Sequence, residues 1–161
     1  MFKKLLIPVL ALSLLVSCKT KNAFQYNQDI VQMENSLVPE ITTTENKIEG
    51  FVNQRQFDSI GVAGEKMEQR VEAEIKKIKD KPAPDVNGGQ EFKKVSIDYF
   101  EYLKSIYTSY KKYGFAATEA VRESEMQHLL EIVNNKQIFM KKMNDAQVKF
   151  AEANGFKMEK K

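Results

Sequence analysis

The chain has 161 residues, with 25 Lys+Arg, 22 Asp+Glu, one His, one Cys and no Trp. This length suits a single domain, and the low content of Gly and Pro (seven and four) favours helices over a β-sandwich. The single Cys excludes an internal disulfide and a CxxC redox site, and the single His excludes a metal site built from several histidines.

Residues 1–17 have the pattern of a bacterial lipoprotein signal peptide. Lys3 and Lys4 precede an apolar run of about a dozen residues, which is too short to span a ~30 Å hydrocarbon core but fits a signal-peptide apolar region. The run ends in Leu-Val-Ser-Cys at residues 15–18, which resembles a lipobox. The alternative is an ordinary secretory signal that has a cysteine nearby by chance.

The lipobox resemblance implies that Cys18 is acylated and becomes the N-terminus, so that the membrane is the first predicted partner. Residues 18–22 then form a lipid-anchored tether, residues 23–157 the folded domain and residues 158–161 a basic tail. No acidic residue follows directly after Cys18. This favours the outer membrane with the domain facing the periplasm, and exposure at the cell surface is the alternative.

The charge of the mature chain argues against nucleic acid as a partner. Removal of Lys3 and Lys4 with the signal leaves 23 basic and 22 acidic residues. We therefore expect no nucleic-acid binding, because no basic surface excess remains.

The first of four helical patterns extends from about Asn22 to Gln54. Pro39 lies inside it and predicts a kink, because proline removes one backbone hydrogen bond and clashes with the preceding turn. The apolar face of this segment comprises Tyr26, Ile30, Met33, Leu37, Ile41, Thr44, Ile48 and Val52.

The second pattern begins near Asp58 or Ser59 and has an apolar face that ends at Ile78. Gly64 lies on that face and Gly61 lies near its start. These glycines indicate either a close approach of another helix or a flexible first turn. Residues 80–89 contain two prolines and a Gly pair, and we predict a loop there.

The third pattern covers about Gln90 to Tyr113, with Leu103 at the centre of its apolar arc and Gly114 as a left-handed stop. The fourth extends from about Thr118 to Asn154, followed by Gly155 and Phe156 as a Schellman ending. The predicted buried face of the fourth segment is Met126, Leu129, Leu130, Val133, Met140, Met143, Val148 and Ala151.

These four segments predict an all-α protein, an up-down-up-down four-helix bundle. Short connections join the first segment to the second and the third to the fourth, which makes each pair antiparallel neighbours. The loop at residues 80–89 joins the two pairs.

The mature chain resembles a family of small bacterial helical lipoproteins that are described only as surface proteins. The resemblance rests on residues 26–31, residues 89–93, Phe100 with Tyr102, and residues 150–156. It covers most of the mature chain and implies the lipid anchor and the helical bundle. It implies no activity and no functional residue.

Catalytic and metal-binding patterns are weak. Glu125 and His128 form an E-x-x-H, the spacing used by di-iron bundles, but those sites need a second such motif and further glutamates. We interpret His128 as an exposed side chain, and we predict no metal, no cofactor and no enzymatic activity. A carboxylate-pair enzyme is kept only as a residual alternative.

Five of the six tyrosines lie in the third segment, and we expect most of them to face the core. Tyr102, at the edge of the apolar arc, is the tyrosine predicted to be visible to a partner. In the fourth segment, Gln137, Asn144 and Gln147 share the apolar face. Either water enters this end of the bundle and the amides contact Thr44 or Asn27, or the three amides line a binding groove.

The resulting functional hypothesis is a non-enzymatic, lipid-anchored envelope module that binds another protein or an envelope component. The alternative is a small-molecule carrier with a cavity between its helices, suggested by a Met- and Tyr-rich interior.

Overall fold

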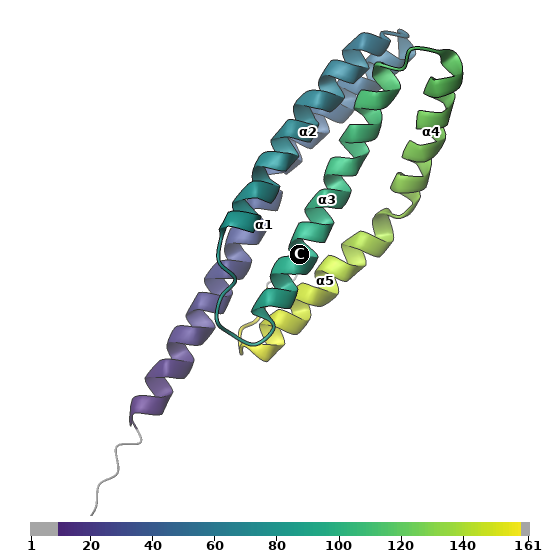
Figure 1. Cartoon of the computed structure of the whole chain (residues 1–161). Helices are drawn as coiled ribbons and strands as arrows, with labels where there is room; N and C mark the ends of the chain where they lie inside the picture. Colours follow the sequence, from purple (N-terminus) through teal and green to yellow (C-terminus); the bar gives the residue numbers. More distant parts are fainter. Residues whose placement is uncertain (1–9, 159–161) are drawn as a thin grey trace, which may run out of the picture.

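The computed structural model describes residues 10–158, and within this range the chain is all-α. The helices are α1 (Leu10–Asn53), α2 (Phe57–Asp80), α3 (Gly89–Gly114), α4 (Glu119–Asn134) and α5 (Lys136–Ala153). Figure 1 shows α2 beside α1 and α3, with α4 and α5 following one another along the other side of α3. Lys3, Lys4 and the start of the predicted apolar run lie outside the described residues, as does most of the basic tail.

The predicted apolar face of α1 supplies much of the core. Tyr26, Ile30, Leu37 and Ile48 are buried on this face, whereas Val52 is exposed. Pro39 lies inside α1, which continues as one helix to Asn53.

The interface between α2 and α3 is the most extensive in the molecule. A Cβ atom on Gly64 would lie 2.6 Å from the backbone nitrogen of Lys111, and a Cβ atom on Gly114 would lie 2.1 Å from the backbone nitrogen of Gly61. The glycines of α2 therefore mark a close helix approach, which was one of the two predicted roles. The prediction for Gly114 was wrong: its φ is not positive, and it serves this approach instead.

The centre of the α3 apolar face also differs from the prediction. Leu103 is only half-buried, whereas Phe92 and Phe100 are buried almost completely. The arc is shifted because α2 and α5 cover the side of α3 that carries these rings, while Leu103 lines a cleft described below.

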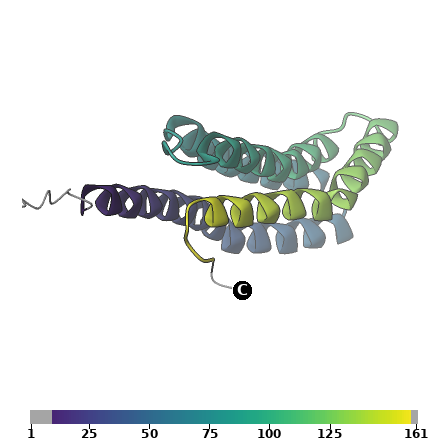
Figure 2. The ribbon, with the colours of Figure 1, turned by 90° about the horizontal axis from the view of Figure 1, so that it is seen from below.

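The fourth predicted segment is divided at Asn135 into α4 and α5, a correction to the single predicted helix. The Asn135 side chain donates to the carbonyl oxygen of Glu131 at 3.1 Å, a local bond that competes with regular helix geometry. Figure 2 shows that the chain changes direction between α4 and α5.

The C-terminal end of α5 has the predicted Schellman geometry. Gly155 has a φ of 70°, and the amide of Phe156 donates to the carbonyl of Ala151 at 3.1 Å. The Phe156 ring folds back against Phe150 and reaches Phe24 of α1, with ring centroids 5.9 and 5.7 Å apart.

Candidate functional site

A groove lies between α1 and α5, and we call it the amide groove. Its volume is about 730 Å³. Five carboxamide side chains from the two helices line it, together with apolar side chains, the hydroxyl-bearing Tyr99 of α3 and two charged residues. The lining residues are Asn27, Gln28, Val31, Glu34, Asn35, Tyr99, Met140, Met143, Asn144, Gln147, Val148, Lys157 and Met158.

The structure brings together two of the three predicted amides. Asn144 and Gln147 both line the amide groove, Asn144 exposed and Gln147 buried. Gln137 is exposed and does not line this groove. The separation lies along the helix axis: Gln137 is in the first turn of α5, about 10 Å before Asn144, and lies beyond the end of the groove.

Asn27 is the most deeply buried polar side chain of the amide groove. Its side chain is 3% exposed, and its Oδ1 atom has no hydrogen-bond partner among the described residues. An unpaired buried acceptor costs about 1–3 kcal/mol, and a donor that reached this atom would recover that cost.

A second cavity continues from the amide groove toward α4, and we call it the tyrosine cleft. Its volume is about 370 Å³, and it shares Glu34, Tyr99 and Met140 with the amide groove. One wall comes from α1, the floor from α3 and the other wall from α4 and α5. The lining residues are Glu34, Val38, Ile41, Glu45, Tyr99, Tyr102, Leu103, Ile106, Tyr107, Tyr110, Val133, Lys136 and Met140.

The tyrosine hydroxyls of the cleft lie near carboxylate side chains of α1. The Tyr99 hydroxyl donates to Oε1 of Glu34 at 2.9 Å. Burial, together with the charge of Glu34, raises the pKa of Tyr99. Burial, together with the charge of Glu45, likewise raises the pKa of Tyr107 and of Tyr110. The cleft therefore presents neutral phenols next to two carboxylates at physiological pH.

The prediction that Tyr102 is exposed to a partner was wrong. Its side chain is 5% exposed, because the ring of Phe139 from α5 stacks on it with ring centroids 4.4 Å apart. Its hydroxyl has no partner among the described residues, and burial raises its pKa. Tyr102 thus reaches the tyrosine cleft from the core, not from the surface.

Several apolar side chains predicted to be buried instead form the edges of these cavities. Val133 and Met140 at the tyrosine cleft are 42% and 44% exposed. They face Val38 of α1, which lies off the predicted apolar face and is 52% exposed. Val148, beside the amide groove, and Leu130 are also exposed. For Leu130 and Val133 the cause is that α4 packs against α3 and makes no extensive contact with α1, so that no helix covers these two side chains.

His128 is exposed, as predicted, and its Nδ1 atom lies 4.0 Å from a carboxylate oxygen of Glu131. Within residues 10–158, no group of three or more His, Cys, Asp or Glu side chains has the arrangement of a metal site. The chemistry that the two cavities offer is hydrogen bonding and apolar contact.

Two groups of residues at the site were not predicted from the sequence. Gln28 and Asn35 line the amide groove from α1, and Phe139 covers Tyr102. The polar residues at 27, 28 and 35 alongside the apolar face of the first segment were the available signal. For Phe139 no signal existed, because its position depends on the break at Asn135.

Comparison of the chain with protein-family models, with curated protein sequences and with solved structures finds no significant match. In the part of the chain that the structure describes, no helix combines the length and the apolar character needed to cross a membrane.

Proposed function

We propose that this protein is a lipid-anchored, non-enzymatic helical module of the bacterial cell envelope that binds a protein or an envelope component. The domain is an up-down-up-down bundle with α1 kinked near Pro39, anchored through acylated Cys18 to the outer membrane and facing the periplasm. The amide groove, continued by the tyrosine cleft, is its binding surface.

The lipobox-like sequence at residues 15–18 supports the anchor, and Cys18 is exposed and available for acylation. The resemblance to small helical lipoproteins points the same way. Two or more acyl chains on one cysteine provide the stable attachment that a single chain does not.

The observation that carries the binding proposal is the buried, unpaired Oδ1 of Asn27 in a groove lined by four other carboxamides. Asn27 and Gln147 are buried, whereas Asn35 and Asn144 are exposed. An apolar side chain at position 27 would avoid the cost of an unpaired buried acceptor, which supports a role for Asn27 other than stability. Side-chain amides offer both donors and acceptors, which suits a polar ligand or a partner's backbone.

A small-molecule carrier is the second candidate function, and the tyrosine cleft favours it. Its volume of about 370 Å³ lies within the range of about 300–1,000 Å³ typical of small-molecule sites. Native mass spectrometry of the purified domain separates the two functions. A retained ligand mass indicates a carrier, and a bare protein mass together with capture of a macromolecule indicates a binding module.

The groove itself is tested by replacing Asn144 and Gln147 together with Leu. We expect a more stable protein that captures less partner or ligand, because polar site residues are suboptimal for folding. The measurements are the thermal unfolding midpoint and the amount of bound material recovered after crosslinking in cells.

Gln137→Leu is the matched control, since it makes the same chemical change on α5 outside the amide groove. It should leave capture unchanged. If the double variant is stabilised and captures as much partner or ligand as the wild type, the amides belong to a hydrated interface between helices. The groove is then not the binding surface.

A further inference from the structure

We infer that the end of the bundle next to Cys18 rests directly on the lipid headgroups, without a flexible linker. We call this surface the membrane-facing end, and it comprises Lys19, Lys21, Phe24, Phe156 and Lys157. The inference rests on the proposed acylation of Cys18. It adds the orientation of the domain on the membrane and the lipid headgroups as the contact of its end.

The first step is the length of the tether. Cys18 and the residues after it are helical, and the first fully buried core residue after Cys18 is Ala23. Five helical residues span about 7.5 Å. The polar layer on each side of a bilayer is about 5–8 Å thick, judged from a ~30 Å core in a total of 40–45 Å. The first buried layer of the bundle therefore lies at the outer edge of the headgroups.

The second step is that the other segments at this end are held beside α1. Phe24 and Phe156 meet edge to face, and Phe156 is fixed by the Schellman turn at Gly155. Lys81, which follows α2, forms an ion pair with Asp29 of α1 at 2.7 Å. The end of the bundle is consequently one packed surface, and an acyl anchor on α1 brings all of it to the bilayer.

The third step is the chemistry of this surface. Lys19 and Lys21 are exposed and lie one and three residues after Cys18, at the depth of the lipid phosphates. The Phe24 ring is 41% exposed, and Lys157, the residue after Phe156, is exposed. Asp85 and Glu91 are exposed near the loop between α2 and α3, so the α1 side of this end is the side that favours phosphate.

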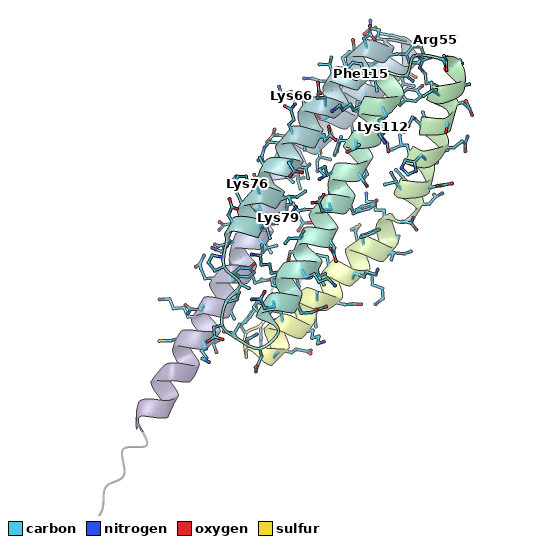
Figure 3. The ribbon with its side chains drawn as sticks, in the orientation of Figure 1. Arg55, Lys66, Lys76, Lys79, Lys112 and Phe115 are labelled. Carbon is cyan, nitrogen blue, oxygen red and sulfur yellow. The ribbon has the colours of Figure 1, made fainter. Side chains whose placement is uncertain are left out.

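With this end of the bundle on the bilayer, the position of each cavity along α1 gives its distance from the membrane. The amide groove begins at Asn27, about 14 Å along α1 from Cys18, whereas Asn53 lies about 50 Å away. Arg55 and Phe115 mark the remote end of the bundle in Figure 3. A partner of the amide groove must therefore come close to the membrane surface.

The absence of Trp from the chain permits a direct test with single-tryptophan reporters. The acylated protein is reconstituted in vesicles of phosphatidylethanolamine and phosphatidylglycerol that contain lipids brominated close to the glycerol backbone. We expect the fluorescence of Phe24→Trp to fall about twofold relative to bromine-free vesicles, since position 24 lies about 9 Å along α1 from the anchor. Phe115→Trp, at the remote end, should remain unchanged.

Two controls separate failure of this inference from failure of the anchor. Cys18→Ala should not float with the vesicles, and if the unmutated Cys18 protein also fails to float, the anchor and the inference are both wrong. A Gly-Ser insertion after Lys21 should keep flotation but abolish the quenching of Phe24→Trp. If Phe24→Trp floats with the vesicles and is not quenched, the bundle stands away from the bilayer and the inference is overturned with the anchor intact.

Phe156→Trp provides a second reporter at the same end, for the case in which Phe24→Trp lowers the unfolding midpoint. Because Phe156 packs against Phe24, its fluorescence should follow the same pattern. Equal quenching at positions 156 and 115 would show that the bundle lies flat on the membrane, which contradicts end-on contact.

Discussion

Phe100→Ala is expected to lower the free energy of unfolding by about 3–5 kcal/mol, the range for truncation of a buried Phe. Phe100 is 0% exposed and lies in the main hydrophobic cluster. The ring of Tyr99 meets it edge to face, with centroids 5.8 Å apart. Chemical denaturation monitored by circular dichroism measures the change, provided that the m-value stays constant.

Lys112→Ala is the control on the same helix, because Lys112 is exposed and its truncation should change stability by no more than about 0.5 kcal/mol. Leu103→Ala should cost less than Phe100→Ala, since Leu103 is only half-buried at the tyrosine cleft. Equal losses for Phe100→Ala and Lys112→Ala would mean that α3 is not packed as described.

Gly64→Ala should destabilise the protein by about 1–3 kcal/mol, the usual cost of overpacking. The added Cβ atom would lie 2.6 Å from the backbone nitrogen of Lys111 and 3.0 Å from the carbonyl oxygen of Tyr107. These are backbone atoms, so α2 and α3 must separate to make room. The thermal unfolding midpoint should fall accordingly.

Gly50→Ala is the matched control, and we expect it to change the stability of the protein in the opposite direction. Gly50 lies within α1, and a Cβ atom there would meet nothing within 4 Å. Replacing an unconstrained helical glycine by alanine should stabilise the protein by about 0.5–1 kcal/mol. A loss of stability at Gly50 as large as that at Gly64 would show that helix approach is not the reason for the effect.

The helical segments could be predicted from the sequence because each carries an apolar pattern with helical period. Tyr26, Ile30 and Leu37 illustrate this, since all three lie on the predicted face and are buried. The Schellman ending at Gly155 was equally predictable, because glycine adopts a positive φ without strain.

The pattern could not show which helix covers a given face. Val133 and Met140 share a face with Leu129 and Met143, yet the first two are exposed and the last two are buried. The difference arises from the break at Asn135 and from the lack of extensive contact between α4 and α1. The same break explains why Tyr102 is covered by Phe139.

The candidate site could be predicted in part. Amides on an apolar face indicate either a hydrated interface or a groove. Asn144 and Gln147 lie in a groove that also contains Asn27, one of the two residues expected to face them, whereas Thr44, the other, does not line it. Gln137 lies on the same helix, α5, but about 10 Å before Asn144 along its axis, and it does not line the amide groove. Periodicity therefore located the helix faces, and tertiary packing decided which amides meet.

The role of the amide groove as the binding surface is tested most directly by site-specific photocrosslinking in cells. A photoreactive residue is placed at position 144, inside the groove, or at position 137, outside it, in the otherwise unchanged full-length protein. Both positions are exposed on α5, so general accessibility is matched. A discrete adduct at position 144 that is lacking at position 137 is the predicted result. Identical adducts at both positions, or none at position 144, would contradict a ligand in the amide groove.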